Sequence, residues 1–234
     1  IFVNPSQFLP NEDFAQYPRD FLRDYYICKQ AGVDYVFYPD TEEIYPRFYK
    51  TYINVEELSD KLEGKYRPGH FKGVATVVLK LLNIAKPNYS YFGQKDAQQV
   101  SLLKKMVNDL NLDTEIRICE TMREDNGLAK SSRNTYLSDK QKSDAAVISR
   151  ALNNAKEKIL NDNYINAERI ISEIKIMIEA KSDDLSVQYI AITDNKMLDD
   201  ITELKNFKGE ILISLAVLCG KTRLIDNIVF EKCL

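Results

Sequence analysis

Short apolar, β-prone runs alternate with amphipathic stretches over the first part of the chain. Residues 74–85 repeat apolar side chains every three or four positions, which predicts a helix with one apolar face, and residues 21–31 and 97–110 also have a helical pattern. Strands that alternate with such helices are typical of a parallel sheet with crossover helices, so we expect an α/β fold. The predicted strands are residues 1–3, 35–38, 89–92 and 114–118.

The pattern changes after Gly127, where helices precede strands. Ser138 and Gln141 have the S-x-x-Q spacing of a capping box, which predicts a helix that begins here and runs to about residue 160. A second helix is expected over residues 167–178. Strands are then predicted at residues 187–193, 211–217 and 224–230.

These patterns predict two domains, residues 1–121 with the parallel sheet and a smaller α+β domain at residues 122–234. In the first, polar or Gly/Pro-containing sequence follows each predicted strand. Because ligands of open α/β sheets bind at the carboxyl ends of the strands, we expect the functional site there.

Composition narrows the function classes. The chain has 234 residues, 44% of them hydrophobic, which is enough to bury a sizeable core. Its 32 Lys and Arg and 35 Asp and Glu are scattered, for a net charge of −3, which argues against nucleic acid as a partner. The four cysteines lie far apart, as is typical of reduced thiols, and no apolar run approaches the ~20 residues of a membrane span. We expect a cytoplasmic protein with no membrane partner.

Residues 91–99, YFGQKDAQQ, carry the sharpest local signal for a binding site. Gly93 would let a ligand approach the backbone, Lys95 offers a mobile cation for phosphate, and Asp96 offers an acceptor for ribose hydroxyls. A nucleotide could therefore bind over the start of the following helix. A plainer interpretation is that Asp96 and Gln99 cap this helix and that Lys95 is solvated.

A second candidate is residues 127–134, GLAKSSRN, with two hydroxyls, a lysine and an arginine. Such a loop can fold over a triphosphate and neutralise the charge that grows on the phosphates as the leaving group departs. An ordinary polar linker between domains would have similar composition.

Residues 2–8, FVNPSQF, run from a predicted strand into a turn shaped by proline. The amides of Asn4 and Gln7 both donate and accept hydrogen bonds, which suits recognition of a hydroxy acid, although a plain turn also explains the Asn-Pro-Ser part. His70 is the one histidine of the sequence. No carboxylate or nucleophile is paired with it in sequence, which favours a structural or substrate-shaping role over that of a base. The carboxylates show no metal-ligand pattern.

In order and spacing, these motifs resemble the pantothenate synthetase family, and the resemblance covers nearly the whole chain. The segments that carry it are FVNPSQF at 2–8, PNED at 10–13, YPR at 17–19, LEG at 62–64, RPGHF at 67–71, GVATV at 73–77, FGQKDAQQ at 92–99, GLAKSSRN at 127–134 and RLIDN at 223–227.

The resemblance implies a Rossmann-like nucleotidylyltransferase domain, related to class I aminoacyl-tRNA synthetases, and a smaller C-terminal domain that closes over ATP. It implies a ligase in which the pantoate carboxylate attacks the α-phosphorus of ATP, pyrophosphate leaves, and the amine of β-alanine displaces AMP. The product, pantothenate, is a precursor of coenzyme A. Magnesium accompanies the ATP, and the family's usual state is a homodimer.

The resemblance also assigns roles to residues. Gln7 would bind pantoate and later β-alanine, Gln99 would hold pantoate, and Asn4 and Tyr17 would add substrate contacts. Lys95 would contact the phosphates, and Met122 lies where the family holds adenine through backbone groups. The implied nucleotide site contains Gly93, Gln94, Lys95, Asp96 and Met122 together with Lys130, Ser131, Ser132 and Arg133, which match the family's counterpart of the synthetase KMSKS loop; Lys95, Ser131, Ser132 and Arg133 would be catalytic.

One family feature does not occur in this sequence. The family's H-x-G-H motif supplies paired histidines that bind the ATP phosphates, and His70 cannot replace both. We expect this motif in a segment upstream of Ile1, and the chain without it to be inactive or a fragment of an active enzyme. Two alternatives stay open: a non-catalytic fragment that binds pantoate or a partner subunit, and another nucleotidylyltransferase that leaves the nucleotide on its product.

Overall fold

The computed structural model describes residues 1–10, 12–161 and 166–233. Asn11, part of the PNED motif, lies outside the described residues. The chain forms two compact units. Unit 1 contains Ile1–Tyr89 and Leu102–Glu115, and unit 2 contains Ser90–Ser101 and Ile116–Leu234. The domain boundary predicted between residues 121 and 122 stays a prediction.

Helices dominate unit 1. The predicted apolar face of residues 74–85 is buried at Val74, Val77 and Leu82, which confirms the helix that the pattern indicated. The helix predicted from residue 21 is also present, and Asp20 caps its start by accepting a hydrogen bond from the amide of Arg23. The elements are the 3-10 helix η1 (Pro5–Gln7) and the helices α1 (Phe21–Gln30), α2 (Thr41–Ile44), α3 (Glu63–Tyr66) and α4 (His70–Ala85).

Two predicted strands of unit 1 are wrong. Residues 1–3 and 35–38 are not strands, although the amino group of Ile1 donates to the carbonyl of Phe37. Tyr35 is 93% exposed, and Phe37 and Tyr38 are exposed as well. An apolar run becomes a strand only where a neighbour completes the hydrogen-bond ladder and one face is buried, and the described structure provides neither here.

A parallel strand pair follows along the chain. The strands β1 (Tyr89–Gly93) and β2 (Glu115–Cys119) form a two-stranded parallel sheet, with helix α5 (Ala97–Asp109) between them in sequence. The predictions for residues 89–92, 97–110 and 114–118 are thereby confirmed, and so is the α/β class.

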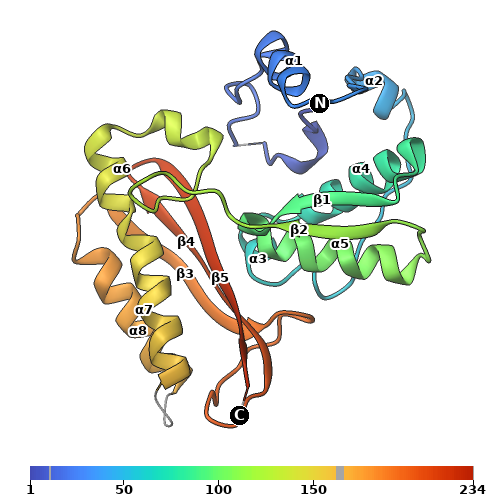
Figure 1. Ribbon diagram of the computed structural model, residues 1–234. Coiled ribbons are helices and arrows are strands. Elements are labelled where there is room, and N and C mark those ends of the chain that lie inside the picture. The colour runs from blue at the N-terminus through green and yellow to red at the C-terminus, as the bar shows by residue number, and fades with distance from the viewer. Residues whose placement is uncertain (11, 162–165, 234) are drawn as a thin grey trace. The chain divides into compact units, whose positions relative to one another are not determined.

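Unit 2 contains an antiparallel sheet with strand order β3-β4-β5. The helices α7 (Val147–Asn161) and α8 (Ala167–Glu179) lie along one face of this sheet (Figure 1). Ser138 and Gln141 form the predicted capping box, but the helix breaks at Ala146 into two. The elements are α6 (Asp139–Ala145), α7 (Val147–Asn161), α8 (Ala167–Glu179), β3 (Leu185–Asp194), β4 (Gly209–Cys219) and β5 (Thr222–Lys232), at the predicted places.

The core of unit 2 lies between the sheet and the helices α7 and α8. Alternate residues of β4 and β5, among them Ile213, Leu215 and Leu224, belong to this core. Because successive side chains of a strand point to opposite faces, Asp226 shares the core-facing side of β5 and Asn227 lies on the other side. In the part of the chain that the structure describes, no helix is both long and apolar enough to cross a bilayer.

Candidate active site

The turn that ends β1 lies in unit 2. The 3-10 helix η2 (Gln94–Asp96) follows Gly93 directly and continues into α5. A Cβ atom at Gly93 would meet no atom within 4 Å, so the backbone here is open to a ligand. Among the described residues, Lys95 Nζ makes no hydrogen bond or ion pair, and the Asp96 carboxylate accepts no hydrogen bond from a backbone amide. The capping interpretation therefore finds no support, since the helix already begins at Gln94.

The second candidate segment begins in a hairpin of unit 2. The amide of Lys130 donates to the carbonyl of Met122 at 2.8 Å, and the amide of Glu124 donates to the carbonyl of Leu128 at 2.8 Å. Gly127 closes the turn with a φ of 94°, a value that favours glycine. The segment is thus a built hairpin, and Met122 is 69% exposed on it.

The serines and arginine after the hairpin start a short helix, the 3-10 helix η3 (Ser132–Tyr136). Ser131 is its N-cap and accepts a hydrogen bond from the amide of Arg133 at 3.3 Å. The buried Asn134 donates from Nδ2 to the carbonyl of Ala129 at 3.1 Å. Residues 130–133 are therefore held at both ends.

Strand β5 connects the two basic segments of unit 2. Both η2 and η3 pack against it. Arg123, in the hairpin, makes a two-pronged ion pair with Asp226 at 2.7 and 3.0 Å. Asn227 donates to the backbone carbonyls of Gln94 at 3.0 Å and Lys95 at 2.8 Å. The structure thus attaches η2, which contains Lys95, and the segment that contains Lys130–Arg133 to the same strand.

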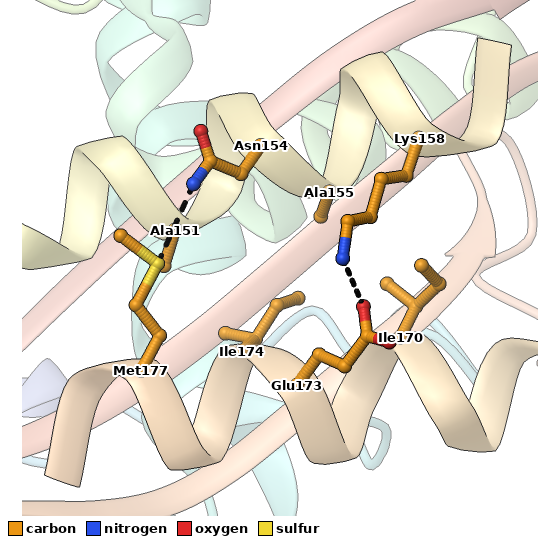
Figure 2. A pocket seen from close by; sticks show the side chains of 8 residues that line it. All are labelled: Ala151, Asn154, Ala155, Lys158, Ile170, Glu173, Ile174 and Met177. Carbon is orange, nitrogen blue, oxygen red and sulfur yellow. Dashed lines mark hydrogen bonds and ion pairs between the residues drawn. The ribbon is translucent and has the colours of Figure 1, made fainter. Parts of the chain in front are cut away.

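The described residues of unit 2 line a hollow beside these segments and another between two of its helices. One of about 390 Å³ lies beside these segments, with Gln94, Arg123 and Asn227 in its lining. The other, of about 210 Å³, lies between α7 and α8 (Figure 2). Its lining is mostly apolar, and its Lys158 and Glu173 neutralise each other at 2.6 Å, so it offers no free charge to a nucleotide.

Gln7 belongs to unit 1, and its amide has a fixed direction. The Oδ1 atom of Asn4 accepts from the backbone amide of Ser6, so the Nδ2 atom of Asn4 must be the donor to Gln7 Oε1, at 3.1 Å. Tyr45 also donates to Asn4 Oδ1 at 2.9 Å, and burial raises the pKa of its hydroxyl, which keeps the proton on this donor. Gln7 therefore turns its Nε2 donor away from Asn4.

Asn4 itself is 3% exposed. Besides Gln7, its Nδ2 atom donates to the carbonyl of Gly73 at 3.2 Å. These internal bonds orient the Gln7 amide, and a direct contact of Asn4 with substrate stays a prediction. Tyr17 is half-buried with its ring against the edge of Phe8, at 5.6 Å between centroids. Gln99 is half-buried on α5 in unit 2.

His70 is buried at the start of α4, and its ring holds backbone rather than a reactive group. Its Nδ1 atom lies 2.7 Å from the carbonyl of Gln7, and its Nε2 atom lies 3.1 Å from Arg67 Nη1. Burial, helped by the charge of Arg67, lowers the pKa of His70 to about 4. A neutral ring that donates from Nδ1 and accepts at Nε2 fits both contacts, which supports the structural role.

Arg67 and Glu12 complete this network, and sequence analysis gave neither of them a role. Arg67 pairs with both carboxylate oxygens of Glu12, at 2.6 and 2.7 Å, and donates to the Gln7 carbonyl at 3.2 Å. Burial opposes ionisation of Glu12, but the bonds and charge of Arg67 prevail and lower its pKa. Both residues lie in segments that carry the family resemblance, Glu12 in PNED and Arg67 in RPGHF, and this membership could have identified them from sequence. Among the described residues, no group of three or more His, Cys, Asp or Glu could hold a metal ion.

Comparison with known proteins gives a consistent result. The model of the family described as pantoate-beta-alanine ligase matches residues 1–229. The chain is 50% identical over 234 residues to a pantothenate synthetase of Caldicellulosiruptor bescii, covering 99% of this chain and 80% of that protein. It is 47% identical over 234 residues to a pantothenate synthetase of Clostridioides difficile, with the same coverage.

Solved structures agree. A crystal structure of pantothenate synthetase from Thermus thermophilus matches with a TM-score of 0.90 and 38% identity, over 97% of this chain and 81% of that one. A pantoate-beta-alanine ligase from Francisella tularensis, complexed with beta-gamma ATP and beta-alanine, matches with a TM-score of 0.74 and 38% identity, over 98% of this chain and 77% of that one.

Proposed function

Because the chain belongs to the pantoate-beta-alanine ligase family, we propose that it condenses pantoate with β-alanine through a pantoyl-adenylate intermediate made from ATP. The observation that carries the proposal is the attachment of both basic segments, with Lys95 in one and Arg133 in the other, to the same strand β5. In the Francisella relative, the printed ligands are an ATP species and β-alanine, the nucleotide and the amine that this reaction needs.

Positive charge is what the first step requires. A carboxylate is a poor nucleophile toward a polyanion, so the site must suppress repulsion and align the two reactants. We assign Lys95 to the phosphates, and Lys130 and Arg133 to the negative charge that develops as pyrophosphate leaves. Ser131 and Ser132 add hydroxyl donors in the same segment.

The remaining nucleotide contacts lie close by along the chain. Gly93 leaves room over the backbone, Gln94 lies beside it, and Asp96 offers its carboxylate to ribose hydroxyls. The backbone of the exposed Met122 hairpin is assigned to adenine.

The acid and the amine need neutral donors that add no further repulsion. Gln7 is suited to this role because its Oε1 atom is engaged by Asn4, which leaves the Nε2 donor for a carboxylate or hydroxyl oxygen. We assign pantoate, and afterwards β-alanine, to Gln7, and pantoate also to Gln99. Tyr17 is a further substrate contact in this proposal.

Magnesium enters this proposal with ATP as part of the substrate. The described residues hold no group of metal-ligating side chains, and magnesium prefers phosphate oxygens and water to a cage built by protein. Bound to the phosphate oxygens of ATP, the ion would neutralise part of the triphosphate charge.

Three further properties belong to the proposal. We propose a Rossmann-like nucleotide-binding domain and a homodimer, as the resemblance implies, and a cytoplasmic location, as the scattered cysteines indicate. The paired histidines of an H-x-G-H motif stay a prediction, and the coding sequence upstream of Ile1 tests it. Because those histidines would bind phosphate, activity is best measured on a full-length protein that contains them.

Product analysis tests the function. With ATP, pantoate and β-alanine, the protein is expected to form AMP, pyrophosphate and pantothenate in equal amounts. Omission of β-alanine should prevent the release of AMP and limit the release of pyrophosphate to about one per site, because the adenylate stays bound. A product that keeps the nucleotide would instead identify another nucleotidylyltransferase, and absence of turnover in the full-length protein would support a non-catalytic role.

A further inference from the structure

Two adjacent polar residues of β5, Asp226 and Asn227, are each only 4% exposed. Burial of a carboxylate or an amide is costly unless its hydrogen bonds are satisfied inside the protein. The hydrogen-bond partners of these two side chains therefore show which segments the side chains hold in place. Both sets of partners lie in the segments that the proposed function assigns to ATP.

Asp226 holds the hairpin. Its two oxygens pair with the two terminal nitrogens of Arg123, and Arg123 Nη1 also donates to the carbonyl of Gly127 at 3.0 Å. One guanidinium thus joins the strand to the turn of the hairpin. Charge-assisted bonds of this two-pronged kind fix direction as well as distance.

Asn227 holds the turn after β1. Carbonyl oxygens only accept, so the atom near Gln94 O and Lys95 O must be the Nδ2 donor, and this fixes the amide orientation. The other end of the amide, Oδ1, accepts from Gln94 Nε2 at 3.2 Å. The backbone of Lys95, the residue assigned to the phosphates, is therefore bonded directly to the strand.

The strand sets the spacing between the two anchors. Asp226 pairs with Leu215 and Asn227 with Ser214 in the antiparallel ladder with β4, the central strand. Adjacent strand residues are separated by about 3.3 Å and point to opposite faces, so the two segments are tied to neighbouring points of one hydrogen-bonded frame. A shift of either anchor would move one set of cations relative to the other.

We infer that Asp226 and Asn227 are positioning residues that hold the Lys95 turn and the Lys130–Arg133 segment in register for a single ATP. The inference rests on the proposed function. Neither side chain touches the nucleotide in this account, because both are buried and fully engaged by protein. Their effect on the reaction is exerted through Lys95 and through the hairpin that carries Lys130.

The test compares Asn227→Ala and Arg123→Lys with Ser214→Ala in the full-length protein. Ser214 is the ladder partner of Asn227, is buried, and makes no hydrogen bond through its hydroxyl in the described structure, so it matches the site without holding a loop. Displacement of reacting groups by about 1 Å can cost on the order of a hundredfold in rate. We expect kcat/KM for ATP to fall roughly ten- to a hundredfold in the first two variants, and to stay within about twofold in Ser214→Ala.

The substrate dependence separates positioning from a merely structural role. Positioning predicts that KM for ATP rises more than KM for pantoate or β-alanine. A structural role predicts a lower unfolding temperature with the KM values of the folded fraction unchanged, and this result would overturn the inference. Arg123→Lys keeps the charge and is partly exposed, so it gives a readout if Asn227→Ala does not fold.

A double variant decides whether Asn227 acts through Lys95. If it does, Lys95→Ala with Asn227→Ala costs about as much as Lys95→Ala alone, because the cation being positioned is already absent. If the losses in kcat/KM of the two single variants multiply in the double variant, Asn227 does not act through Lys95. Should Lys95→Ala alone leave ATP kinetics unchanged, the assignment of Lys95 to the phosphates fails and the inference falls with it, whereas the ligase reaction itself is tested separately by product analysis.

Discussion

Replacement of Gly73 by alanine tests the placement of Gln7 most sharply. Gly73 lies in α4 where η1 crosses it, and a Cβ atom there would lie 2.2 Å from the carbonyl oxygen of Ser6 and 2.8 Å from the amide nitrogen of Gln7. Both are backbone atoms, so no rotamer change relieves the clash. To reach an ordinary contact of 3.4 Å, η1 must move by about 1.2 Å.

Two opposing effects of Gly73→Ala decide whether the free energy of unfolding rises or falls. Alanine in place of a helical glycine favours the helix by about 1 kcal/mol, while overpacking against a fixed neighbour costs about 1–3 kcal/mol. The net loss in the free energy of unfolding is therefore small, between about 0 and 2 kcal/mol. Displacement of Gln7 by about 1 Å weighs more in catalysis, because such a shift can cost on the order of a hundredfold, about 2.7 kcal/mol of transition-state stabilisation.

The assay is kcat/KM for pantoate in the full-length protein, measured beside a urea unfolding curve. Asn83→Ala, on the exposed side of the same helix, is the matched control and should change neither quantity. Gly73→Ala should remain folded and lose roughly a hundredfold in kcat/KM for pantoate. A folded Gly73→Ala protein within twofold of the unsubstituted enzyme would refute the reasoning, because either η1 would not be held as described or Gln7 would not bind pantoate.

Four further predictions test the roles of Asn4, Lys95, Gln99 and His70. Asn4→Asp removes the donor that engages Gln7 Oε1, so KM for pantoate should rise about tenfold or more in initial-rate measurements. Lys95→Ala should lower pantoyl-adenylate formation by orders of magnitude in a single-turnover assay, with the fold intact. Gln99→Ala should chiefly raise KM for pantoate, read from saturation curves. His70, with a folded-state pKa near 4 against 6.5 when unfolded, binds its proton more readily in the unfolded chain, so the free energy of unfolding should fall by about 3 kcal/mol from pH 6.5 to 4, and His70→Gln should lose this share of the pH dependence.

Each of these four predictions has a result that would contradict it. Unchanged pantoate saturation in Asn4→Asp or Gln99→Ala would reject the role given to that amide. Near-normal adenylate formation in Lys95→Ala would move ATP away from η2. Identical pH profiles of urea unfolding for His70→Gln and the unsubstituted protein would show that the ring is not buried in its neutral form.

Local patterns predicted most of the elements. The helical period of residues 74–85, the S-x-x-Q box at Ser138 and the three strands of unit 2 depend on neighbours in sequence, and each is present. Residues 35–38 have the composition of a strand but lie largely exposed. Strand formation depends on a distant partner that composition does not reveal, and this explains the two wrong strands.

The residues of the candidate site also fall into two groups, those that local sequence indicates and those that it does not. Lys95 and the 130–133 segment stand out because their residue types suit phosphate, and the resemblance supplied their roles. The residues that orient them do not stand out: Arg123 and Asp226 are 103 positions apart, and Arg67 and Glu12 are 55 apart. Such partly buried pairs are specified by packing, so only the folded chain shows which partners meet.

Exchange of labelled pyrophosphate into ATP by the full-length protein, with and without pantoate, tests the central claim most directly. Formation of an adenylate is reversible, so the account predicts exchange that requires pantoate, does not require β-alanine, and is lost in Lys95→Ala. Exchange that proceeds without pantoate, or that persists undiminished in Lys95→Ala, would contradict it.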